Sequence, residues 1–309
     1  MKAISLEQKE KKKKVTYDKW GIYFIIPFFV IYLIFTLVPQ LLTIVYSFCE
    51  YYMKGLSQVG PNFVGFKNYI SIFTPLYGTI DVIKYFGNTM LMWIMGAVPQ
   101  FGIALLLAVM FTSTRLNLKG QGFFKTVFYL PNVIMASAFS LLVFQIFDLA
   151  GPINQILVSN GGEKYNFLAH ELPVKTLIAM MNFVMWFGNT TIVLMAGIQG
   201  IDESLFESAR IDGASSFKVF KDITMPLLKP IFVYCFITSM IGGMQMFDAP
   251  SILTNKMGTP DSTSKTMVMY LNDLLRVKNY GKAGAVSMIL FVITGILSVI
   301  VYRFINKED

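Results

Sequence analysis

Six long stretches of this chain contain no Asp, Glu, Lys, Arg or His, and they constrain the fold more than any other feature. They are Gly21–Tyr46, Asn88–Phe111, Thr126–Ile146, Thr176–Gly200, Pro230–Phe247 and Ala283–Tyr302. All 44 charged side chains, 26 basic and 18 acidic, fall between them. A helix needs about 20 apolar residues to cross the ~30 Å hydrocarbon core of a bilayer, whereas a transmembrane barrel uses ~10-residue alternating segments. The pattern therefore predicts an all-α integral membrane protein with six transmembrane helices.

The distribution of basic residues predicts how the chain is oriented. Seven lysines lie within the first 19 residues, directly before the first span. Such a cluster next to a span is typical of a cytoplasmic segment, and an even number of spans then places both termini in the cytoplasm. Sixteen of the 26 Lys and Arg residues fall in the segments assigned to the cytoplasm, although the opposite loops are longer in total. This bias follows the positive-inside rule. The orientation of the chain in a lipid membrane therefore explains the net charge of +8, and no nucleic acid partner is expected.

The same features predict the organisation of the chain. Residues 1–20 form a basic cytoplasmic N-terminus, 21–46 a first span that is retained, and 47–87 an extracytoplasmic loop. Residues 88–302 form a core of five spans that includes a cytoplasmic segment over 201–229, and residues 303–309 form a cytoplasmic C-terminus.

Several kinds of site are missing from the sequence. His170 is the only histidine, so no catalytic triad and no histidine-based metal site is expected. No phosphate-binding loop is present, because Gly281-Lys282 lacks the preceding glycine and the following hydroxyl. No span contains an ionisable residue, which argues against a membrane enzyme and a proton-coupled carrier. A sodium-coupled carrier that holds its ion through backbone carbonyls remains an alternative.

The segment 201–229 has the pattern of two short helices. Ser204 and Glu207 have capping-box spacing at the start of the first helix. Gly213 can supply the positive φ that ends it, and Ser215 can cap the second helix.

Pro226 and Pro230 are expected to break the chain before the fifth span begins. These patterns alone leave two alternatives open, a helical loop on the membrane surface and an element that docks a partner.

The motifs of this segment resemble a known family. Glu207-Ser208-Ala209, Asp212-Gly213-Ala214 and Ile223-x-x-Pro226 resemble the EAA loop of binding-protein-dependent ABC importer permeases, whose usual form is E-A-A-x-x-D-G-A followed by I-x-L-P. Ser208 and Met225 are departures from that form. The resemblance implies the type I, MetI-like permease fold, in which this loop forms coupling helices that sit in a cleft of the ATPase subunit. The residues implied to couple to the ATPase are Glu207, Ser208, Ala209, Asp212, Gly213, Ala214, Ile223 and Pro226.

The resemblance extends along most of the chain. Further matching elements are Gly65-Phe66-Lys67-Asn68-Tyr69, Asn88-Thr89, Phe128-Tyr129-Leu130-Pro131, Gly151-Pro152-Ile153-Asn154 and Phe247-Asp248 with Ile252-Leu253-Thr254. These elements are similar to carbohydrate-type permeases, and the last to the first permease subunits of maltose and glycerol-phosphate importers. The usual G-G-P is replaced by Lys256-Met257-Gly258-Thr259-Pro260. The resemblance implies import of a sugar or oligosaccharide, with a non-sugar solute such as glycerol phosphate as the alternative.

The family also implies partners and a location. The expected assembly contains a second six-span permease, two ATPase subunits and an extracytoplasmic solute-binding protein, in the cytoplasmic membrane of a prokaryote. The ATPase would bind ATP and magnesium, so this chain is expected to be no enzyme and to hold no cofactor and no metal. Its first span is expected to pack peripherally.

Uncharged polar groups inside the spans are candidates for a substrate pathway, because hydrocarbon offers them no hydrogen-bond partner. Asn182, Trp186 and Asn189 share one face of the fourth span, and amides beside an indole suit a sugar. The alternative is that such residues only join helices. The candidate residues are Asn132, Ser137, Asn182, Trp186, Asn189, Thr190, Ser239 and Gln245.

Overall fold

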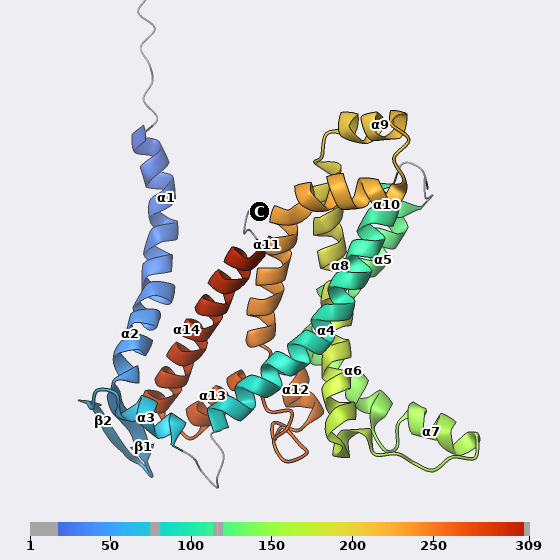
Figure 1. Cartoon of the computed structure of the whole chain (residues 1–309). Coiled ribbons are helices and arrows are strands. Elements are labelled where there is room, and N and C mark those ends of the chain that lie inside the picture. The colour runs from blue at the N-terminus through green and yellow to red at the C-terminus, as the bar shows by residue number, and fades with distance from the viewer. Residues whose placement is uncertain (1–17, 75–80, 114–115, 117–119, 306–309) are drawn as a thin grey trace, which may run out of the picture. The chain divides into compact units, whose positions relative to one another are not determined.

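The structure is a computed structural model that describes residues 18–74, 81–113, 116 and 120–305 (Figure 1). The chain forms two compact units, Met1–Val45 and Tyr46–Asp309. The first unit contains α1 (Asp18–Tyr32), a π-helical turn η1 (Leu33–Leu37) and most of α2 (Val38–Ser47).

The second unit is mainly helical and contains a small hairpin. Its two strands are β1 (Cys49–Lys54) and β2 (Ser57–Phe63). Its helices and helical turns are α3 (Lys67–Phe73), α4 (Asp81–Thr112), α5 (Gln121–Val133), α6 (Ala136–Phe147), α7 (Pro152–Ser159), η2 (Phe167–Ala169), α8 (Glu171–Gln199), α9 (Glu203–Ile211), α10 (Ser216–Val219), η3 (Phe220–Thr224), α11 (Met225–Met244), α12 (Asp248–Leu253), α13 (Met267–Arg276) and α14 (Tyr280–Ile305).

Six helical segments among the described residues are long and apolar enough to cross a membrane. They are Trp20–Ser47, Asp81–Thr112, Ala136–Ser159, Glu171–Gln199, Ser216–Leu253 and Tyr280–Ile305. The predicted helical class with six spans is therefore confirmed.

The third charge-free stretch differs from the single helix predicted over Thr126–Ile146. Helix α5 begins at Gln121 and ends at Val133, the backbone is extended at Ile134, and α6 begins at Ala136. Pro131, in the last turn of α5, cannot donate a hydrogen bond to the preceding turn, and helices often end near such a residue. The apolar segment therefore contains a break that charge counting does not reveal.

The prediction that two prolines break the chain before the fifth span is wrong. Helix α10, the π turn η3 and α11 follow one another directly from Ser216 to Met244. Pro226 lies directly after η3, at the second residue of α11, and Pro230 lies inside the same helix. Neither proline has an N–H to donate to the preceding turn. A π turn widens a helix locally, which accommodates an irregular hydrogen-bond pattern without ending the helix.

The hairpin in residues 47–87 was not predicted. Strands β1 and β2 pair antiparallel, with Cys49 opposite Phe63 and Lys54 opposite Ser57. The backbone N–H of Met53 donates to the carbonyl of Lys278 at 3.1 Å, which ties the hairpin to the start of α14. Helix α4 also begins within this region, at Asp81, earlier than the charge-free stretch suggests.

Helices α4, α8 and α11 form the centre of the second unit, with buried apolar side chains such as Phe101, Leu194 and Leu228 between them. A Cβ atom at Gly96 of α4 would lie 2.8 Å from the carbonyl oxygen of Ala179 in α8. Small residues of this kind let helices approach closely within a membrane, where hydrophobic burial does not drive their association.

The two ends of the second unit carry different elements (Figure 1). Helices α9 and α10 lie at one end, beside the end of α4. The hairpin, α3, α7 and α13 lie at the other end.

Candidate functional site

Helix α9 begins one residue after an aspartate cap. The backbone N–H of Ser204 donates to Oδ1 of Asp202 at 3.0 Å, so Asp202 is the N-cap. The predicted capping box of Ser204 and Glu207 is therefore wrong, because Ser204 lies inside the helix and Asp202 caps it. The backbone and side-chain hydrogen bonds that Ser204 donates to this carboxylate lower the pKa of Asp202 below its ordinary value.

The end of α9 explains why a glycine follows the aspartate. Gly213 has φ +72°, which confirms the predicted positive φ. The N–H of Ala214 donates to the carbonyl of Ala209 at 2.9 Å, and the N–H of Gly213 donates to the carbonyl of Arg210 at 3.1 Å. These two bonds form a Schellman motif. The Asp212-Gly213-Ala214 sequence is thus a helix stop that reverses the chain.

Helix α9 presents most of its surface outward. Within α9, all of which the structure describes, Ala209 is the only buried residue. Glu207 and Ser208 are exposed on the helix, and Asp212 is exposed at its C-cap. Ser208 donates its hydroxyl to the carbonyl of Ser204 at 2.9 Å, a bond that stays within the helix.

The second half of the loop is a helix that continues into the fifth span. The Ser215 hydroxyl accepts from the N–H of Lys218 at 3.3 Å, so the predicted cap is confirmed. Phe217 is 73% exposed, whereas Thr224 is buried. The helix is therefore exposed at its start and becomes buried where it approaches the fifth span.

Ile223 and Pro226 lie in this continuous helix, on either side of the point where η3 passes into α11. Ile223 is half-buried, and Pro226 is exposed.

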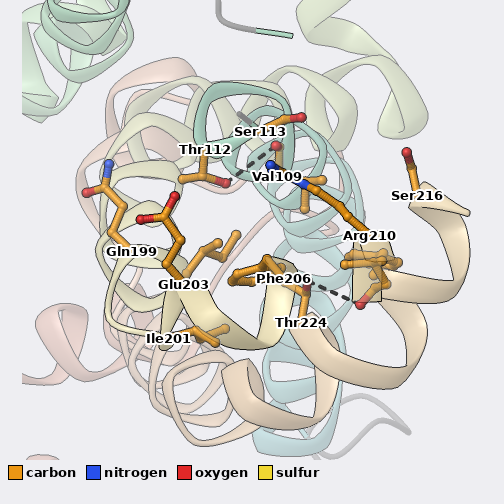
Figure 2. Close-up of a pocket in the computed structure, with 13 residues that line it drawn as sticks. Val109, Thr112, Ser113, Gln199, Ile201, Glu203, Phe206, Arg210, Ser216 and Thr224 are labelled. Atoms are coloured by element: carbon orange, nitrogen blue, oxygen red, sulfur yellow. Dashed lines mark hydrogen bonds between the residues drawn. The ribbon is translucent and has the colours of Figure 1, made fainter. Parts of the chain in front are cut away.

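A cavity of about 290 Å³ lies between α9 and the ends of the spans (Figure 2). Its wall includes apolar side chains of α8, α9 and η3, namely Ile198, Phe206 and Phe220. Thr112 and Arg210 contribute polar groups, and Figure 2 shows the Arg210 side chain extending across the cavity toward Val109 and Ser113 at the end of α4.

A second candidate region, the polar residues within the spans, contains a chain of hydrogen bonds that joins three helices. Gln100 of α4 is 1% exposed; its Nε2 donates to the Thr190 hydroxyl of α8 at 2.8 Å, and its Oε1 accepts from the Ser239 hydroxyl of α11 at 3.3 Å. Trp93 Nε1 in turn donates to Ser239 at 3.3 Å. Thr190 and Ser239, both pathway candidates, thus already have partners between helices.

Gln100 and Trp93 were not among the residues predicted from the sequence. Both lie in the charge-free stretch of the second span. The signal that could have found them is the one applied to the other spans, a polar side chain within hydrocarbon.

The other candidates have different surroundings. Asn182 and Asn189 are half-buried on α8, and Trp186 between them is 44% exposed. Asn132 Nδ2 donates to the carbonyl of Met185 at 3.2 Å, which connects α5 to α8.

Ser137 is half-buried on α6, and Gln245 is exposed directly after the end of α11. Four of the candidates therefore lie on α8, namely Asn182, Trp186, Asn189 and Thr190. Asn132 contacts the same helix, whereas Ser137 lies on α6 and Gln245 follows the end of α11.

Residues 100–307 match the protein family described as the binding-protein-dependent transport system inner membrane component, over well more than half of the chain. This chain belongs to that family. The matched range contains the EAA-like loop, the last part of the second span and the whole of the four spans that follow.

Two curated permeases resemble this family member along most of their length. The lactose transport system permease protein LacF of Rhizobium radiobacter is 30% identical over 287 residues, which are 91% of this chain and 92% of LacF. The arabinooligosaccharides transport system permease protein AraP of Bacillus subtilis is 29% identical over 283 residues, 90% of this chain and 85% of AraP.

A solved structure shares the permease fold. It is a chain of a bacterial alginate ABC transporter in complex with an alginate pentasaccharide-bound periplasmic protein, with a TM-score of 0.76 at 21% identity over 94% of this chain and 95% of that chain. The predicted family and fold are confirmed, and so is the prediction that this chain is a permease subunit and not itself an enzyme.

Proposed function

We propose that this permease carries a sugar or oligosaccharide from an extracytoplasmic binding protein into the cytoplasm. The observation that carries the proposal is the resemblance to LacF and AraP along about nine tenths of the chain, because both names specify sugar transport. The similarity of fold to a polysaccharide importer agrees with it.

The proposed assembly contains this chain, a second six-span permease, two ATPase subunits and the binding protein. The ATPase subunits would hold ATP and magnesium, since this sequence has no phosphate-binding loop. The proposed location is the cytoplasmic membrane of a prokaryote with both termini in the cytoplasm. The bias of Lys and Arg supports this orientation, and α14 ends at the same end of the bundle as α9 (Figure 1).

In the proposed coupling step, the ATPase contacts the exposed face of α9 that carries Glu207 and Ser208. Gly213 then sets the angle between α9 and α10, and the neighbouring motif residues Asp212 and Ala214 complete the turn. Because α10, η3 and α11 are continuous, a displacement of the loop moves the fifth span directly. Loop motion would thereby alter which side of the membrane the pathway faces.

The proposed pathway runs along the face of α8 that bears Asn182, Trp186 and Asn189. Amide groups can exchange hydrogen bonds with hydroxyls, and an indole packs against the apolar faces of a sugar ring. The hydroxyls of Thr190 and Ser239 are engaged between helices, so we assign them to holding the pathway wall together.

The test measures solute uptake by cells in which the gene for this chain is deleted and the neighbouring genes are intact. Radiolabelled lactose, arabinooligosaccharides and other oligosaccharides are compared with glycerol 3-phosphate. The proposal expects loss of uptake of at least one oligosaccharide, restored by the wild-type chain. Unchanged uptake of every sugar together with loss of glycerol 3-phosphate uptake would contradict it.

A further inference from the structure

Helix α9 is connected to the spans by few side chains. Ala209 is its only buried residue, and the cavity of about 290 Å³ separates part of the helix from the ends of α4 and α8. The side chain that extends across this gap is Arg210, and Figure 2 shows it directed toward Val109 and Ser113.

The end of α4 is suited to receive a guanidinium group. The last carbonyls of a helix have no N–H partner within the helix and carry partial negative charge. Of the last four carbonyls of α4, that of Val109 accepts from the Thr112 hydroxyl at 3.4 Å; the same hydroxyl donates to the carbonyl of Ala108 at 2.8 Å. An arginine has five N–H donors for the remaining carbonyls at this end.

No acid competes for Arg210 among the residues that the structure describes. The ion pairs found there are Lys175–Glu171, Lys265–Asp273 and Arg276–Asp273. Glu203 also lines the cavity, but Figure 2 shows it on the side of Gln199, away from the guanidinium.

We propose that Arg210 is a positioning residue that holds α9 to the end of α4 across the cavity. A displacement of α9 is then passed to α4 as well as to α11. Helix α4 in turn carries Gln100, which bonds to α8 and α11, so the displacement reaches the helices of the pathway. This inference rests on the proposed coupling function of the loop.

The first test is substitution of Arg210 by Met, which keeps the apolar stem and removes the charge. The uptake measured is that of an oligosaccharide whose import is lost when the gene is deleted. It is expected to fall about two- to five-fold, because a charge at a helix end contributes a modest free energy. Arg210→Lys should retain most of the uptake. Lys125→Met is the matched control, since Lys125 is a basic residue of α5 that does not line the cavity. Wild-type uptake in Arg210→Met would overturn the proposal.

A charge swap separates a bridge from simple neutralisation of the α4 dipole. Arg210→Glu should lower uptake further than Arg210→Met, because a carboxylate is repelled by the carbonyl end of α4. Adding Ser113→Arg should restore uptake in the Arg210→Glu background and not in the Arg210→Met background. Equal restoration in both backgrounds would show that only the charge at the end of α4 matters, and would overturn the bridge.

A distance measurement tests the contact without relying on transport. Spin labels are placed at Ser204→Cys on α9 and Met110→Cys on α4; the native Cys49 and Cys235 are buried. The distance distribution should broaden in Arg210→Met and stay narrow in Lys125→Met. An unchanged distance distribution would refute the bridge between α9 and α4, even if sugar uptake by the permease is confirmed. A broadened distribution in a protein that takes up no sugar would support the bridge and refute the proposed substrate.

Discussion

At the scale of single residues, the loop that contains α9 and α10 depends on backbone geometry as much as on side-chain chemistry. Gly213 has a positive φ, yet a Cβ added there would meet nothing within 4 Å. Any effect of substitution must therefore arise from backbone strain and not from a steric clash. A left-handed conformation costs an L-residue about 1–2 kcal/mol, less for Asn.

This geometry predicts that Gly213→Val impairs coupling and that Gly213→Asn, the matched control, is close to wild type. Valine is β-branched and poorly tolerated at positive φ, so the angle between α9 and α10 should change. The measurement is ATP hydrolysis by the purified complex together with uptake in vesicles, and both should fall several-fold in the Val variant only. Equal rates in all three proteins would remove Gly213 from the mechanism.

Gln100 is a residue whose effect should be on stability. Gln100→Leu removes two hydrogen bonds between helices, each worth about 0.6 kcal/mol on average in a membrane protein. We expect the midpoint of thermal unfolding of the purified permease to fall by a few degrees. Thr238→Val is the control, because the Thr238 hydroxyl bonds only to carbonyls of its own helix. A similar shift in both variants would argue against the network.

At the scale of helices, prolines acted in opposite ways that the sequence did not distinguish. Pro131 precedes a break between α5 and α6, whereas Pro226 and Pro230 lie within a helix that continues. The outcome depends on whether neighbouring turns can widen to satisfy the affected carbonyls, as η3 does, and this is a property of packing. The spans, the positive φ of Gly213 and the helix cap at Ser215 were predictable because each depends only on residues that are neighbours in the sequence.

Other parts of the fold were not predictable for the same reason. The hairpin forms in a loop region and is tied to the carbonyl of Lys278, more than 200 residues away. The hydrogen-bond partners of Gln100 lie on two other spans. Pairings at such separation depend on tertiary structure, which a single sequence does not reveal.

The face of α8 carries a prediction of its own. Asn182→Ala or Asn189→Ala should slow sugar uptake about two- to ten-fold, since a hydrogen bond contributes roughly 0.5–1.5 kcal/mol net. Basal ATP hydrolysis and assembly of the complex should persist. Met180→Ala, an exposed position on the same helix outside the stripe, is the control. If the complex fails to assemble in the Asn variants, the stripe faces a neighbouring helix and not the sugar.

At the scale of the whole molecule, the surface is understandable only with partners present. Large apolar side chains are exposed along α1 and α14, for example Phe24 at 82% and Phe291 at 72%. Lipid or other spans must cover such surfaces, because exposing large apolar patches to water is energetically unfavourable. The exposed face of α9, in contrast, combines polar residues such as Glu207 and Ser208 with the apolar side chains of Leu205 and Ile211.

The central claim is that this permease works through a separate ATPase, and co-purification tests it most directly. The chain is affinity-tagged at its own locus and extracted in mild detergent. The chains that purify with it are identified by mass spectrometry, and the copy number of each is obtained from the mass of the intact complex. We predict a second six-span permease and two copies of a chain with a phosphate-binding loop, and reduced recovery of the ATPase with Gly213→Val. A stable assembly of this chain that contains no nucleotide-binding subunit would contradict the account.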